Sequence, residues 1–255
     1  MPIYDRPVKS LMADWAKKHL SPGQTFSKSD AVPWFAEHYP KVKRNTVGMH
    51  IEGMSVNNHI RKHHPSIKPN SGHDLFFKLG PDRYRLWNPN SDGQPYYKQD
   101  AENQASDIIN QIGSSDDGTE SDNGVEATTE FAFEKDLRNY LVKNLGLIEP
   151  GLHLYEEEEI TGIEFPVGGR FIDILAVDQT GSYVVIELKV SRGYDRVIGQ
   201  LLRYMAWVEQ NMETTKRVRG MIVAKEITND LKLAASRIAD VRLIEYEISF
   251  KLNSI

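Results

Sequence analysis

Residues 169–189 constrain the fold of this 255-residue chain more than any other segment. Two apolar runs rich in β-branched residues flank a turn-like Asp-Gln-Thr-Gly-Ser stretch, which predicts a β-hairpin. If the hairpin is centred on Thr180, Asp173 lies opposite Glu187. Because side chains alternate along a strand, Lys189 shares the face of Glu187, and Asp173 joins them from across the ladder.

Two carboxylates and an ammonium on an apolar hairpin are costly to bury without a compensating ion. Such a trio suits metal-assisted hydrolysis of a phosphodiester. Magnesium binds hard oxygen ligands and keeps waters, so Asp173 and Glu187 are candidate ligands for Mg²⁺, or for Mn²⁺ in its place. Lys189 could orient or deprotonate the attacking water and offset charge at phosphorus. The alternative is an exposed Glu-x-Lys pattern with cross-strand pairing on a solvated sheet face.

Helical patterns stand on both sides of the hairpin. The sequence after it, from Gly193 onward, is helix-like and places Gln200 and Tyr204 four residues apart, on one helical face. Before the hairpin, residues 131–145 form an amphipathic pattern, and Glu134 lies beside its apolar stripe. Glu134 could therefore point inward toward the hairpin.

These features carry a resemblance to a known family. The region from about Glu130 to Ile255 resembles the C-terminal nuclease domain of the NucS/EndoMS-type endonucleases, within the PD-(D/E)XK superfamily. The segments that carry it are Glu134, Gly-Arg-Phe-Ile-Asp173-Ile-Leu-Ala-Val-Asp, Val-Val-Ile-Glu187-Leu-Lys189 and Gly-Gln200-Leu-Leu-Arg-Tyr204-Met. One departure is Ile172, which stands where the superfamily nominally has proline, at a position that varies widely.

The resemblance implies roles for six candidate catalytic residues. Asp173 and Glu187 would bind magnesium, and Lys189 would assist the water. Glu134 would support the metal, while Gln200 and Tyr204 would orient the site or the substrate backbone. It also implies DNA as substrate and a homodimer. The helix around Leu137 and Leu141, or an edge strand, could supply the dimer surface.

The expected C-terminal fold is α/β (α+β), a restriction-endonuclease-like mixed sheet flanked by helices. Beyond the hairpin, strand, helix and strand patterns follow one another, and an apolar Met-Ile-Val-Ala run predicts a parallel crossover. The expected strands and helices outside the hairpin are strand 152–155, helix 194–209, strand 219–224, helix 229–239 and strand 241–248. The acidic run 156–159 is interpreted as a solvated strand end or turn rather than as extra metal ligands, because neighbouring strand residues face opposite ways.

The formal net charge of −5 is unevenly distributed along the chain. Residues 1–98 hold 15 Lys and Arg against 8 Asp and Glu, a net charge of +7. Residues 99–129 hold 8 acids and no base, which predicts an acidic flexible linker, with a short helix possible at 105–112. Residues 130–255 carry −4 and form the expected nuclease domain. The basic N-terminal domain therefore suggests a nucleic-acid partner.

The N-terminal region, residues 1–98, is expected to be a winged-helix-like nucleic-acid-binding domain. Three helical patterns, the first with Val8, Leu11, Met12 and Trp15 inward, precede two strand patterns around a Gly80-Pro81-Asp82 turn. Winged helices also dock proteins, which is the alternative. The candidate DNA contacts are Lys41, Lys43, Arg44, Thr46 and His50 at the third helix, and Lys78, Arg83 and Arg85 at the wing.

Composition excludes several classes of protein. The chain has no cysteine, so disulfides, thiolate zinc sites and cysteine nucleophiles are excluded. No apolar run reaches membrane-spanning length and the first residues do not form a secretory signal, so a cytoplasmic protein without a membrane partner is expected. The resulting hypothesis is a Mg²⁺-dependent DNA endonuclease, acting in restriction or defence or directed to a modified base or structure. The alternatives are a non-catalytic nucleic-acid-binding regulator and an RNA-directed nuclease.

Overall fold

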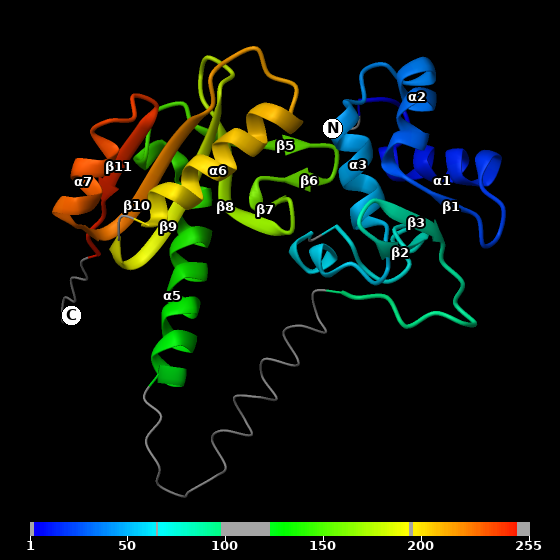
Figure 1. The fold of residues 1–255 in the computed structure, drawn as a ribbon, viewed down its shortest axis with the longest axis horizontal. Helices are drawn as coiled ribbons and strands as arrows, with labels where there is room; N and C mark the ends of the chain where they lie inside the picture. The colour runs from blue at the N-terminus through cyan, green and yellow to red at the C-terminus, as the bar shows by residue number, and fades with distance from the viewer. Residues whose placement is uncertain (1–2, 65, 98–122, 194–195, 249–255) are drawn as a thin grey trace, which may run out of the picture. The chain divides into compact units, whose positions relative to one another are not determined.

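The computed structural model describes residues 3–64, 66–97, 123–193 and 196–248 (Figure 1). The chain divides into two compact units. Unit 1 holds residues 1–118 and 156–161, and unit 2 holds residues 119–155 and 162–255. The short helix predicted at 105–112 and most of the predicted linker lie outside the described residues. Among the helices of the described part, none is long and apolar enough to cross a membrane.

Unit 1 combines helices with a small antiparallel sheet of strand order β1-β3-β2. Its elements are α1 (Val8–His19), β1 (Thr25–Phe26), α2 (Lys28–His38), α3 (Arg44–Gly53), the 3₁₀ turn η1 (His59–His63), β2 (Phe76–Gly80) and β3 (Arg83–Leu86). The predicted inward stripe of the first helix is confirmed, because Val8, Leu11, Met12 and Trp15 are all buried. The aromatic rings of Trp15, Phe26 and Phe76 pack edge to face in this core.

The acidic run is part of unit 1 and not a solvated strand end. It forms a small hairpin, β5 (Glu156–Glu157) with β6 (Ile160–Thr161). Glu157 lies 2.7 Å from Lys43 Nζ, and Glu159 accepts from Lys9 Nζ at 2.8 Å. Burial raises the pKa of Glu159, but His73 and Lys9 outweigh it and bring the pKa to about 2. The turn was predicted correctly; its solvation was not, because cations in unit 1 pair with the carboxylates.

Unit 2 is built on a mixed sheet. Its strand order is β11-β10-β9-β8-β4, with β7 also paired to β8. The strands are β4 (His153–Leu154), β7 (Ile163–Val167), β8 (Arg170–Val177), β9 (Tyr183–Gly193), β10 (Arg219–Ile227) and β11 (Val241–Glu245). The antiparallel β8–β9 hairpin pairs Ile174 with Ile186, which is the predicted register. Strand β10 pairs in parallel with both β9 and β11, so the predicted crossover is also confirmed.

Helices α5 (Asn123–Lys143) and α6 (Arg196–Asn211) cover opposite faces of this sheet (Figure 1). Leu137 of α5 shares a core cluster with Ile186 and Leu188 of β9. Gln200 of α6 contacts Glu187, and adjacent strand residues point to opposite faces. A third helix, α7 (Asn229–Ala235), precedes β11. Helix α5 begins at Asn123, so the last part of the predicted linker is helical.

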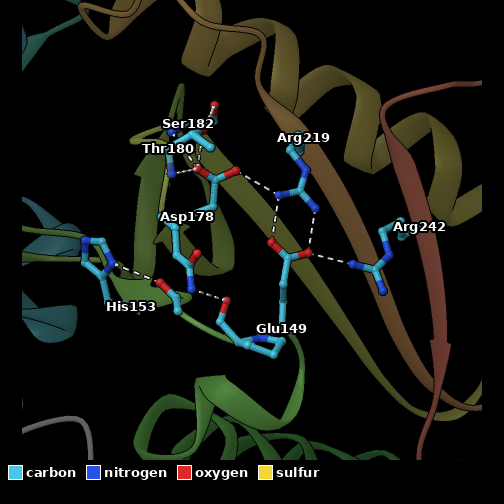
Figure 2. A network of polar contacts seen from close by, with 10 residues as sticks. Glu149, His153, Asp178, Thr180, Ser182, Arg219 and Arg242 are labelled. Carbon is cyan, nitrogen blue, oxygen red and sulfur yellow. Dashed lines mark hydrogen bonds and ion pairs between the residues drawn. The ribbon is translucent and has the colours of Figure 1, made fainter.

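A polar network fixes the turn of the β8–β9 hairpin (Figure 2). Asp178 Oδ1 accepts hydrogen bonds from the backbone N–H groups of Thr180 at 2.9 Å and Ser182 at 3.0 Å. Arg219 of β10 donates to Asp178 Oδ2 at 2.8 Å and binds both oxygens of Glu149, at 2.8 and 2.6 Å. The network therefore ties the turn to a neighbouring strand and to the segment before β4, and supports the register on which the opposed carboxylates depend.

Candidate active site

The hairpin brings Asp173, Glu187 and Lys189 together, as the alternation of its strands predicted. Asp173 Oδ2 on β8 accepts from the backbone N–H of Leu188 at 2.8 Å. On β9, Lys189 Nζ lies 3.3 Å from Glu187 Oε1 and donates to the Leu188 carbonyl oxygen at 2.7 Å. Two carboxylates from adjacent strands and one ammonium thus occupy a single end of the hairpin.

Burial makes this cluster electrostatically unusual. Glu187 is 1% exposed, and its pKa is raised to about 8 by burial and by the charge of Asp173. Burial also raises the pKa of Asp173. Burial alone would lower the pKa of Lys189, but the charges of Glu187 and Asp173 raise it, so the amine is an ammonium. The raised pKa values of both carboxyl groups indicate that the nearby positive charge does not fully offset their two negative charges at this buried position.

Helix α6 supplies two further polar side chains. Gln200 Nε2 donates to Glu187 Oε1. The hydroxyl of Tyr204, one turn further along the same helix, lies 3.4 Å from Gln200 Nε2. Tyr204 is buried, which raises the pKa of its phenol. The predicted face of the helix therefore points at the carboxylate cluster.

Glu134 approaches the same cluster from α5. Its side chain is half-buried, and its negative charge raises the pKa of both Glu187 and Lys189. All six residues predicted as catalytic from the sequence thus come together in unit 2, five through a connected set of strand and helix contacts and Glu134 through its charge.

The donor set fits a hard divalent cation. Glu187 Oε2 is buried and has no hydrogen-bond partner within the described part of the chain. An unpartnered buried carboxylate oxygen is costly unless a cation or a proton satisfies it. Among the described residues, no three His, Cys, Asp or Glu side chains gather as a metal-binding group. Asp173 and Glu187 supply the carboxylate oxygens that such an ion prefers.

Sequence reasoning missed two charged residues beside this cluster. Arg138, four residues after Glu134 on α5, is 6% exposed and its Nη2 lies 3.0 Å from Glu164 Oε1 on β7. Arg138 stands next to Leu137 in the amphipathic pattern, so the helical spacing alone could have placed it near the inward face. Glu164 lies on a strand whose pairing the sequence did not reveal.

Some of the basic candidate DNA contacts of unit 1 are exposed, and others form ion pairs with carboxylates of the same unit. Lys41, Arg44 and Arg83 are exposed. The other basic candidates contact carboxylates of unit 1: Lys43 with Glu157 at 2.7 Å, Lys78 with Glu52 at 2.8 Å, and Arg85 with Asp92 at 2.7 and 2.6 Å. The exposed cations are therefore the ones whose side chains a polyanion can reach from solvent.

Thr46 and His50 do not face solvent, which corrects their interpretation as groove or phosphate contacts. They are 0% and 5% exposed, and His50 Nδ1 lies 3.0 Å from the Thr46 carbonyl oxygen. Each residue immediately precedes a core position of α3, Val47 or Ile51, and turns inward with it. Burial lowers the pKa of His50, so its ring carries no charge for a phosphate.

Two family models match the chain. Residues 133–253 match the Endonuclease NucS C-terminal domain, and residues 7–86 match a domain of unknown function, DUF7669. Residues 133–253 are thus a NucS-type endonuclease C-terminal domain, as the motifs in the sequence indicated.

Curated relatives are similar to part of the chain. Endonuclease NucS 1 of Halobacterium salinarum is 32% identical over 105 residues, 41% of each chain. Endonuclease NucS of Pyrococcus abyssi is 30% identical over 100 residues, 39% of this chain and 36% of its own. The chain therefore spans about two-fifths of the length of these relatives. One similar solved structure is a repair endonuclease from Pyrococcus abyssi, with 25% identity, a TM-score of 0.37 and coverage of 52% of this chain and 50% of that one. Another is an EndoMS–dsDNA complex, with 25% identity, a TM-score of 0.38 and coverage of 46% of each chain.

Proposed function

We propose that the protein is a divalent-cation-dependent DNA endonuclease, with Mg²⁺ or Mn²⁺ as the cofactor. The observation that carries the proposal is the buried carboxylate pair of a NucS-type domain, in which Glu187 keeps one oxygen without a hydrogen-bond partner among the described residues. The NucS relatives, which are named endonucleases, support the reaction class.

Each side chain of the site would have a distinct role in the reaction. Asp173 and Glu187 would hold the cation, which when bound supplies Lewis-acid activation of water and neutralises charge on the phosphate. Lys189 is an ammonium, so it would orient the attacking water and offset the developing negative charge rather than abstract a proton. Gln200 holds Glu187 by a hydrogen bond, and Tyr204 lies next to Gln200, so both would keep that carboxylate in place.

The N-terminal unit would bind the DNA. Its order of three helices, with a short strand after the first, and a final hairpin is that of a winged helix, and we propose this fold for residues 1–98. The exposed cations Lys41, Arg44 and Arg83 support a phosphate-binding surface. A DNA-binding domain separate from the catalytic domain is typical of a restriction or defence enzyme, or of one directed to a modified base or structure.

A homodimer would let two sites cut both strands of a duplex. The leucines expected at its interface, Leu137 and Leu141, are core residues instead, because they pack against the sheet. On the same helix, Phe133 and Tyr140 are 61% and 58% exposed and seven residues apart, so they supply the apolar surface that a twofold contact would need. Light scattering of the wild type and of a Phe133→Ser, Tyr140→Ser variant tests this: a dimer mass that becomes a monomer mass supports it, and a monomeric wild type contradicts it.

The experiment that tests the proposed activity is cleavage of matched unmodified, modified and mismatched duplex DNAs, with single-stranded DNA and RNA alongside, in Mg²⁺ or Mn²⁺. Cation-dependent cleavage of at least one DNA is expected. Cleavage of RNA alone would identify an RNA-directed nuclease, and binding without any cleavage would identify a non-catalytic regulator.

A further inference from the structure

An ion pair between a buried arginine and a half-buried glutamate lies beside the candidate active site, and neither residue has a role described above. Arg138 of α5 is 6% exposed and pairs through Nη2 with Glu164 Oε1 on β7, at 3.0 Å. Its Nε is buried and has no hydrogen-bond partner in the described residues. Burying a guanidinium with an unused donor is unfavourable. The presence of Arg138 at this position therefore indicates a role other than packing.

The partner of this guanidinium has a strained backbone. Glu164 has φ 47°, in the left-handed region that residues other than glycine rarely adopt. The regular β7–β8 pairs on either side of Glu164 place it across the ladder from Asp173. Strained residues persist only where their surroundings hold them, and they concentrate at functional sites. The strain here is one strand away from a proposed metal ligand.

The pair also joins the two elements that must meet at the site. Glu134 stands one helical turn before Arg138 on α5, and Asp173 stands on the strand next to Glu164. The ion pair therefore connects the Glu134 helix to the neighbour of the Asp173 strand. The positive charge of Arg138 acts on Asp173 as well, lowering the pKa that burial raises.

We propose that Arg138 and Glu164 are positioning residues of the active site. Their ion pair braces α5 against β7 and so fixes the placement of Glu134 relative to Asp173 that binding of a divalent cation requires. The inference rests on the proposed function, because it concerns the same site.

Calorimetric titration of the full-length protein with Mn²⁺ alone, without DNA, tests the brace. Arg138→Gln and Glu164→Gln should each weaken Mn²⁺ binding by about 10- to 100-fold, the usual effect of losing a residue that supports a metal ligand. For Arg138→Gln, simple charge repulsion predicts the opposite sign, because removal of a cation beside the site would tighten Mn²⁺ binding. The double variant should lose no more than either single variant, and Arg138→Lys should recover part of the loss.

Arg217→Gln is the matched control, since it removes an exposed ion pair with Asp240 in the same unit. On a cleaved DNA, the brace variants should lower kcat and leave KM near the wild-type value. Mn²⁺ binding that is unchanged or tighter in Arg138→Gln, with only a lower melting temperature, would overturn the proposal. If Arg138→Gln does not fold, Arg138→Lys decides, because it keeps the positive charge and changes only the geometry of the pair: weaker Mn²⁺ binding supports the brace, and unchanged or tighter binding overturns it. A wild type that binds Mn²⁺ but cleaves no DNA would count against the proposed function and leave the brace to be judged by the titration.

Discussion

At the scale of single residues, the structure gives Lys189 the most specific chemical role. The carboxylates of Glu187 and Asp173 keep it an ammonium, so its contribution is positive charge and a donor next to the reacting phosphate. Lys189→Met should therefore lower the cleavage rate by about 100-fold or more, and Lys189→Arg should retain part of it because the charge remains. Single-turnover cleavage at saturating Mg²⁺ measures both. Equal, complete loss in the two variants would argue for proton abstraction instead.

Asp178 gives the structure a defined dependence on pH. Burial raises its pKa, but hydrogen bonds from Thr180 and Ser182 and from Arg219 bring it to about 2, below the ordinary value of 3.8. A carboxylate whose pKa is lower in the folded state contributes stability above pH 3.8 that is lost as the pH falls through about 2. The difference in unfolding free energy between the wild type and Asp178→Asn should therefore shrink between pH 5 and pH 3. Urea denaturation over that range measures it; a difference independent of pH would contradict the assignment.

At the scale of elements, the network around Arg219 holds the hairpin turn to the sheet. Arg219→Gln leaves Asp178 and Glu149 without their main shared partner, so we expect a loss of about 1–3 kcal/mol in unfolding free energy. Arg217→Gln, at an exposed pair on the same segment, should change it by less than about 0.5 kcal/mol. Equal effects of the two substitutions in chemical denaturation would show that the network does not brace the turn.

The sequence predicted those parts of the site that follow from local periodicity. The hairpin register comes from alternation around one turn, and the shared face of Gln200 and Tyr204 comes from helical spacing, so both could be inferred without a structure. The Arg138–Glu164 pair could not, because it joins a helix to a strand whose partner is fixed only by the tertiary fold. Helical spacing also failed for Thr46 and His50, since residues at the edge of an apolar stripe turn inward or outward according to what packs there.

At the scale of the whole molecule, the proposed division of labour makes DNA affinity depend on exposed cations of unit 1. In a Glu187→Ala background, which removes cleavage, Lys41→Ala, Arg44→Ala and Arg83→Ala should each weaken duplex binding. Each should also reduce the slope of log affinity against log salt by about 1, because one phosphate contact is lost. Lys17→Ala and Lys18→Ala, exposed on α1, are the controls. If all five substitutions are equivalent, DNA binding is not organised around the third helix and wing.

If DNA cleavage depends on a cation held by Asp173 and Glu187, the Glu187 carboxylate is indispensable, and a comparison of the wild type with Glu187→Ala measures this dependence. Both proteins, purified in parallel, are incubated with a cleavable duplex and increasing Mg²⁺, with Glu209→Ala, an exposed position on α6, as the control. Mg²⁺-dependent cleavage is expected from the wild type and the control, and none from Glu187→Ala. Wild-type levels of Mg²⁺-dependent cleavage by Glu187→Ala would show that the carboxylate pair does not hold the catalytic cation.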